Sequence, residues 1–109
     1  MTNPIIERLR TQLQEGRDSP LLRFGLGSAL FQEKAFAEAA EHLQVCTQQM
    51  PDHSAAWKQL GRTYMALEQW ESARTTLTRG LQVAKDRGDK QVEREIGVFL
   101  RKLDRLGGD

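Results

Sequence analysis

The sequence repeats itself with a period of 34 residues. Shifting residues 18–51 by that length superimposes large apolar residues and small residues on their counterparts in residues 52–87. The superimposed pairs are Asp18 and Asp52, Leu26 and Leu60, Gly27 and Gly61, Phe36 and Trp70, Ala39 and Ala73, and Leu43 and Leu77. A unit of this length forms a pair of helices that cannot bury its apolar side alone, so neighbouring units must stack. The repeat therefore predicts an all-α fold, a short helical solenoid.

Start and stop signals divide the chain into six expected helices. Asn3-Pro4 and Ser19-Pro20 each place an N-cap residue before a proline at the first helical position. Pro51 ends the second helix of the first unit, and Gly88 is suited to a left-handed C-cap. No run alternates apolar and polar residues as a strand would. We expect one domain with a capping helix in 1–17, repeat units in 18–51 and 52–87, and a second capping helix in 88–109.

Apolar residues recur at helical spacing along each segment, which indicates the faces that pack together. Trp57 and Tyr64 share one face of the first helix in the second unit. Gly80 lies inside the helix that follows, where glycine costs about 1 kcal/mol relative to alanine. We expect a neighbouring helix to cross closely at Gly80, because close packing would offset that cost.

Composition excludes several classes of partner. The chain has 16 Lys+Arg and 15 Asp+Glu, so its net charge of +1 shows no bias toward nucleic acid or an anionic membrane. No stretch approaches the roughly 20 apolar residues of a membrane span, and we expect no signal peptide. A single cysteine excludes an internal disulfide and fits a reducing compartment. We therefore expect a cytoplasmic protein with neither a nucleic-acid nor a membrane partner.

Two motifs suggest ligand chemistry and are better explained by packing. Gly25-Leu26-Gly27 resembles part of a phosphate loop, but no strand precedes it and no third glycine follows at the required place. We interpret Gly27 as a close-packing position. His42 and Cys46 lie four residues apart and could face one metal ion, but the chain has no other cysteine and His53 lies in a different turn. We interpret this pair as a core thiol beside a surface imidazole.

No set of side chains indicates catalysis. The carboxylates that share helices, namely Glu38 with Glu41 and Glu93 with Glu95, are interpreted as solvated helix-face residues. None of them has a plausible nucleophile or base at catalytic spacing. We therefore expect a protein that is not an enzyme and that uses no cofactor or metal.

The two units resemble tetratricopeptide repeats, whose pattern reads roughly W-x2-L-G-x2-Y, then A-x3-F, then a small residue and proline. Residues 54–87 supply Trp57, Leu60, Gly61, Tyr64, Ala73, Leu77 and Gly80. Residues 20–53 supply Leu26, Gly27, Leu30, Ala39, Leu43, Cys46 and Pro51. Arg23 departs from the first aromatic position, and Lys85 from the closing proline. The chain looks like the small stand-alone bacterial members, in which two repeats lie between capping helices.

The resemblance implies a right-handed superhelix whose first helices line a concave groove for a peptide or protein segment. Transferred position by position, the groove residues are Leu21, Phe24, Ser28, Phe31, Lys58, Gln59, Arg62 and Met65. The family's chaperone-tail binders hold a terminal carboxylate with two Asn plus Lys and Arg. Lys58 and Arg62 could supply the cationic part, but other residues fill the Asn positions, and Asn3 is the only asparagine. An acidic or C-terminal peptide stays open as the ligand.

Several alternatives remain at this point. Phe24 and Phe31 are either exposed anchors in the groove or core residues, and Lys58 and Arg62 are either ligand contacts or a solvated pair. The leading hypothesis for function is a protein–protein interaction adaptor. The alternative is a self-assembly module in which Val92, Phe99 and Leu103 of the last helix pair between chains. We expect a monomer rather than a homo-oligomer.

Overall fold

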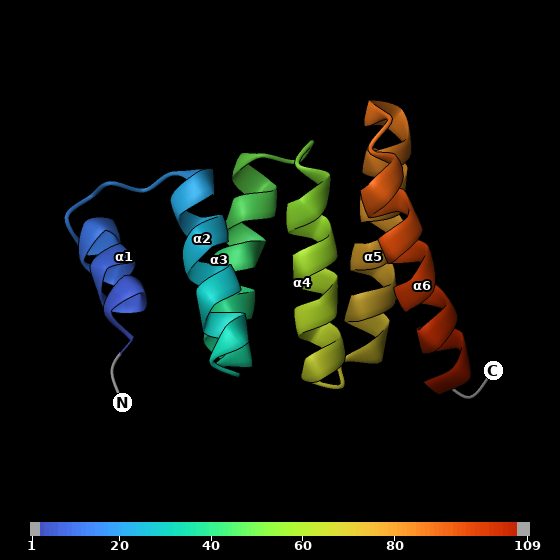
Figure 1. The fold of residues 1–109 in the computed structure, drawn as a ribbon, viewed down its shortest axis with the longest axis horizontal. Helices are drawn as coiled ribbons and strands as arrows, with labels where there is room; N and C mark the ends of the chain where they lie inside the picture. The colour runs from blue at the N-terminus through green and yellow to red at the C-terminus, as the bar shows by residue number, and fades with distance from the viewer. Residues whose placement is uncertain (1–2, 107–109) are drawn as a thin grey trace.

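The computed structural model describes residues 3–106, which form six helices and no strand. The helices are α1 (Pro4–Gln14), α2 (Pro20–Gln32), α3 (Phe36–Gln49), α4 (Ser54–Ala66), α5 (Trp70–Arg87) and α6 (Lys90–Leu106). They follow one another from α1 at one end of the molecule to α6 at the other (Figure 1). This architecture confirms the predicted all-α helical repeat solenoid. Within the described residues, no helix combines the length and the apolar character needed to cross a membrane.

The helices begin and end close to the predicted signals. Asn3 Oδ1 accepts hydrogen bonds from the backbone N–H groups of Ile5 (2.9 Å) and Ile6 (3.3 Å), which caps α1. Gly88 has φ +75°, the left-handed conformation that glycine adopts without a steric cost, and it caps α5. Asp52 does not cap α4. Its carboxylate instead lies 3.0 Å from Arg87, which ties the α3–α4 turn to the end of α5.

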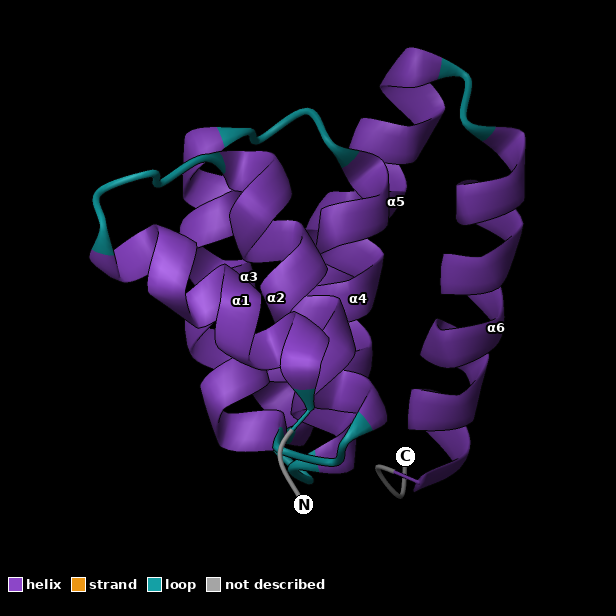
Figure 2. Cartoon of the chain, turned by 60° about the vertical axis from the view of Figure 1, so that its left-hand side comes forward, coloured by secondary structure: helices purple, strands orange, loops and turns teal. Residues whose placement is uncertain are grey.

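Two glycines allow the paired helices to approach closely. α2 packs mainly on α3 and α4 mainly on α5. All the described elements are helices joined by loops (Figure 2). A Cβ atom at Gly27 would lie 2.6 Å from Leu43 Cγ, and one at Gly61 would lie 2.5 Å from Leu77 Cγ. Both leucines are fully buried. The interpretation of Gly27 as a close-packing position is therefore confirmed.

Gly80 lets two helices approach α5 closely, namely α4 of the same repeat and α6, which follows it. A Cβ atom there would lie 2.7 Å from Trp57 Cβ and 3.1 Å from Ile96 Cδ1, so α4 and α6 both approach α5 at this residue. The expected close crossing is confirmed. Tyr64 is buried and hydrogen-bonded to Gln44, and the half-buried Trp57 donates from Nε1 to the Pro51 carbonyl at 2.8 Å.

The last helix contributes its apolar stripe to the core of its own chain. Leu103 is buried, and Val92 and Phe99 pack against the core cluster. Leu103 is therefore not available for the contact between chains that the self-assembly hypothesis assigned to it. The apolar side of α6 serves packing on α5 and α4 of the same chain.

A series of side-chain polar contacts links α1 to the first repeat. Arg10 contacts Glu38 through two nitrogens at 2.6 and 3.1 Å, and Glu38 lies 3.5 Å from His42 Nε2. His42 Nδ1 lies 3.1 Å from Arg23, whose guanidinium also contacts Asp18 at 2.9 Å. The His42 side chain is only 12% exposed. The interpretations of His42 as a surface imidazole and of Glu38 as a solvated carboxylate are therefore wrong, because both take part in contacts between helices.

The other half of that interpretation holds, because Cys46 is a core residue. Its side chain is fully buried, and burial raises the pKa of the thiol by disfavouring the thiolate. A thiol in these surroundings stays protonated and unreactive near neutral pH. Cys46 therefore contributes packing.

Glu38 makes the stability of the fold depend on pH. The hydrogen bond from the Arg10 guanidinium holds the pKa of Glu38 below its ordinary value of 4.5. A carboxylate with a lowered folded pKa stabilises the fold above its unfolded pKa, and this contribution is lost as pH falls through the folded value. Urea unfolding at pH 7 is expected to show that Glu38→Gln is less stable than the wild type, with the difference closing below about pH 4. Glu41→Gln, at an exposed position of the same helix, is the control, and an equal loss there would contradict the assignment.

Candidate peptide-binding pocket

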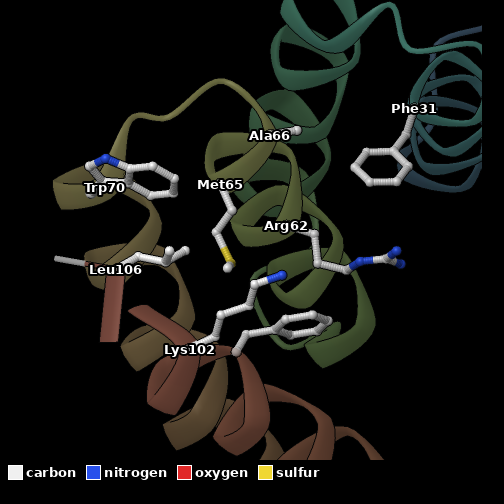
Figure 3. A pocket seen from close by; sticks show the side chains of 8 residues that line it. Phe31, Arg62, Met65, Ala66, Trp70, Lys102 and Leu106 are labelled. Atoms are coloured by element: carbon white, nitrogen blue, oxygen red, sulfur yellow. The ribbon is translucent and has the colours of Figure 1, made fainter. Parts of the chain in front are cut away.

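Four helices line an open pocket of about 280 Å³ near the C-terminal ends of α2, α4 and α6. α2 and α4 form one side, the start of α5 closes one end, and α6 forms the opposite side (Figure 3). The lining residues are Phe31 from α2, Arg62, Met65 and Ala66 from α4, Trp70 from α5, and Phe99, Lys102 and Leu106 from α6.

The walls of this pocket are largely apolar. The Phe31 ring meets the Phe36 ring edge to face, with 5.2 Å between centroids, so Phe31 is held in a fixed orientation. Met65, Trp70 and Phe99 pack partly against the core and keep part of their surface open. Leu106 is 52% exposed at the rim. Such a pocket can accept one apolar side chain of a ligand.

Two cationic side chains join the apolar walls. The Arg62 guanidinium lies 4.8 Å from the Phe31 ring centroid and 5.6 Å from that of Phe99. Its only hydrogen bond to a side chain in residues 3–106 is donated to Gln59 Oε1 at 3.3 Å. Lys102 is exposed and extends from α6 toward Met65 and Arg62 (Figure 3). Neither cation forms an ion pair with a carboxylate in the described part of the chain, so each is available to an anionic ligand.

The structure brings three of the eight sequence-predicted groove residues together in this pocket: Phe31, Arg62 and Met65. The other five lie outside its lining. Phe24 packs edge to face on His53 at 5.0 Å, and Leu21 is 67% exposed on α2. Ser28 is half-buried and Gln59 is buried on α4.

Lys58 is neutralised inside the molecule. Its amine lies 2.7 Å from Glu95 Oε1 on α6, and the hydrogen bond from this amine holds the pKa of Glu95 below its ordinary value. Lys58 is therefore neither a solvated side chain nor an unpaired cation, and Glu95 is not the solvated carboxylate that was expected. The pair fixes α6 against α4 and so helps to position the far wall of the pocket.

Sequence reasoning missed the three pocket residues on α6, because it assigned that helix to a cap. The sequence does contain a pattern from which these residues could have been found. Ile96-Gly97 repeats Leu60-Gly61 at a spacing of 36 residues, slightly longer than the 34 residues between the first two units. The match makes α6 an equivalent of α2 and α4, the helices from which groove residues were expected.

Comparisons with known proteins agree with this architecture. The family model described as "Tetratricopeptide repeat" matches residues 30–92. The chain is 48% identical over 101 residues to the TPR repeat-containing protein PA0015 of Pseudomonas aeruginosa. This match covers 93% of this chain and 96% of that protein. It is 40% identical to protein BPP2914 from Bordetella parapertussis, whose solution structure matches with a TM-score of 0.83 over 96% of this chain and 91% of that one.

A more distant structure shares the fold. The first TPR of Spaghetti (RPAP3), solved bound to the HSP90 peptide SRMEEVD, is 20% identical and matches with a TM-score of 0.75. That match covers 96% of this chain and 91% of the other. The family model, the two closer relatives and the six-helix solenoid agree, and this chain belongs to the tetratricopeptide repeat family.

Proposed function

We propose that this chain is a protein-interaction module that binds a peptide segment in the pocket between α2, α4, α5 and α6. The observation that carries the proposal is the pairing of apolar walls with Arg62 and Lys102, two cations without a carboxylate partner in residues 3–106. Tetratricopeptide repeat proteins are generally interaction modules without enzymatic activity, and we propose that this chain likewise acts by binding.

The chemistry of the pocket selects an apolar side chain next to an acidic group. Burying a leucine-sized side chain between Phe31, Met65 and Phe99 would contribute about 1.5–3 kcal/mol. A neighbouring carboxylate would receive charge-assisted hydrogen bonds from the guanidinium of Arg62 and the amine of Lys102. Arg62 already packs on two aromatic rings, so it would lose little side-chain freedom when a ligand binds.

This proposal changes which cations hold the ligand. The pair suggested by the sequence was Lys58 and Arg62, but Lys58 is occupied by Glu95. We assign the second cation to Lys102 on α6. The peptide seen with the Spaghetti TPR domain, SRMEEVD, combines acidic and apolar residues. It shows that a related fold accepts a ligand of this kind.

Removing the two cations is expected to weaken peptide binding at least about tenfold, because each charge-assisted hydrogen bond contributes about 1.5–3 kcal/mol. The measurement begins with selection of random heptapeptides displayed on phage against the wild-type protein. The selected peptides are expected to place an apolar residue beside Asp or Glu. Their affinities for Arg62→Gln/Lys102→Gln are then measured by calorimetry.

The matched control is Arg8→Gln/Arg17→Gln, which removes the same charge at exposed positions outside the pocket. Equal affinity for wild type and the pocket variant, or selection of basic peptides, would contradict the proposal. Sedimentation at micromolar concentration tests the self-assembly alternative. A dimer that dissociates when peptide is added would assign the pocket to contacts between copies of the chain.

A further inference from the structure

α6 repeats the packing position of α2 and α4, but no side chain from another helix of residues 3–106 lies over its glycine. Ile96 is fully buried and lies on Gly80 of α5, and the equivalent Leu60 of α4 is also buried. Gly97 follows Ile96 as Gly61 follows Leu60. α6 therefore presents Gly97 where α4 presents Gly61.

The surroundings of these glycines differ. At Gly61 the space that a Cβ atom would need is filled by Leu77 of the following helix, and at Gly27 it is filled by Leu43. At Gly97, apart from the adjacent residues and the backbone of α6 itself, the only atom of residues 3–106 within 4 Å of that position is an Arg101 guanidinium nitrogen at 3.5 Å. No side chain from another helix of residues 3–106 therefore fills the place over Gly97 that Leu43 and Leu77 fill over Gly27 and Gly61.

An open hollow of about 480 Å³ marks this place, and it shares no residue with the peptide pocket. It lies between α5 and α6, and Leu81, Gly97 and Val98 supply its apolar part. Val98 is 53% exposed, which makes it one of the few large apolar side chains on the surface of the described chain. A glycine beside exposed apolar residues lets another helix approach closely enough to bury them.

The charge around this hollow limits what can cover it. Lys85, Arg94 and Arg101 line it together with a single carboxylate, Glu93. A second copy of the chain presenting the same face would bring six basic side chains against each other. Like charges across an interface are unfavourable, so charge complementarity selects a partner with acidic residues.

We propose that the face around Gly97 docks an amphipathic α-helix of a partner protein. This helix packs a leucine-sized side chain over Gly97, as Leu43 and Leu77 pack over Gly27 and Gly61. It directs acidic residues toward Lys85, Arg94 and Arg101. The docked helix completes a third helical pair, and the peptide pocket between α2, α4, α5 and α6 stays open while it is bound.

The chain itself supplies a matched pair of probes. A peptide of residues 36–49 contains Leu43, two glutamates and no Lys or Arg, whereas a peptide of residues 70–87 contains Leu77, two acidic and four basic residues. Both are synthesised with a hydrocarbon staple on the side opposite the leucine, because short isolated helices are unstable in water. Cys46 is replaced by alanine in the first peptide.

Each peptide is titrated into the full ¹⁵N-labelled chain and followed by NMR. The 36–49 peptide is expected to shift the amide signals of Gly97, Val98 and Arg101. Replacing its leucine by alanine is expected to weaken binding at least about tenfold, since the buried leucine supplies most of the apolar contact. The 70–87 peptide is expected to bind at least about tenfold more weakly, because the peptide and the face both carry a net positive charge and repel each other.

Protein variants locate the contact. Gly97→Leu is expected to abolish binding of the 36–49 peptide, whereas Ala37→Leu, at an exposed position of α3, leaves it unchanged. Arg62→Gln/Lys102→Gln also leaves it unchanged, which separates this proposal from the peptide pocket. Absence of binding, undiminished binding to Gly97→Leu, or shifts centred on Phe31 and Met65 would overturn it. Shifts at Gly97 that depend on protein concentration without peptide would instead assign the face to a second copy.

Discussion

Replacing Leu77 by alanine is expected to lower the free energy of unfolding by about 3 kcal/mol. Leu77 is fully buried, and it fills the space that the absent Cβ atom of Gly61 leaves on α4. Alanine cannot reach across that space, so the variant loses both the apolar burial and the contacts that line the resulting cavity. A chain of this size is stabilised by only about 5–15 kcal/mol in total, so the change is a large fraction.

The measurement is thermal and urea unfolding of the two proteins, in which a drop of about 15 °C in the melting temperature is expected. Val98→Ala is the control, because it removes apolar atoms from an exposed position of α6 and should change stability by no more than about 0.5 kcal/mol. A Leu77→Ala variant as stable as Val98→Ala would mean that α4 and α5 do not pack as described.

Alanine at Gly61 and alanine at Gly97 are expected to act in opposite directions. At Gly61 the new methyl group would overlap Leu77, and overpacking of this kind costs about 1–3 kcal/mol. At Gly97 the methyl group meets no side chain of residues 3–106 closer than 3.5 Å, apart from those of its two chain neighbours, so the better helix propensity of alanine should stabilise the protein by about 0.5–1 kcal/mol. Urea unfolding of the two variants measures both effects.

The contact with Leu77 is tested by combining the substitutions. In a Leu77→Ala background the methyl group at residue 61 has room, so Gly61→Ala should cost less than it does in the wild-type protein. If Gly61→Ala lowered the free energy of unfolding equally in the two backgrounds, a group other than Leu77 would be the one that overlaps the methyl group. Destabilisation by Gly97→Ala would show that the α6 position is filled, and it would also weaken the helix-docking proposal.

The packing inside each repeat could be predicted because it depends on local spacing. Gly27 and Leu43 are separated by 16 residues, as are Gly61 and Leu77, and one helical hairpin brings each pair together. Apolar periodicity, cap residues and the 34-residue period all indicate the same arrangement. The glycine inside α5 was predictable for the same reason, since only a close helix crossing favours glycine there.

The pocket could not be predicted from those signals. Its far wall comes from α6, which follows α4 with a spacing of 36 residues, so a search at 34 residues does not align it. Phe99 belongs to the apolar stripe of α6, and periodicity does not show that one edge of that stripe turns toward Arg62. Lys58 pairs with Glu95, 37 residues later, because of the way α4 and α6 lie against each other, which no local pattern encodes.

The most direct test of the proposed peptide pocket uses two methionines as reporters. Met65 lines the pocket, whereas Met50 lies in the α3–α4 turn next to His53, beside a different hollow. In protein labelled with ¹³C at the methionine methyl groups, addition of a selected acidic–apolar peptide is expected to shift the Met65 signal and to leave the Met50 signal in place. A titration in which Met50 shifts, or in which Met65 stays unchanged at saturating peptide, would contradict the account.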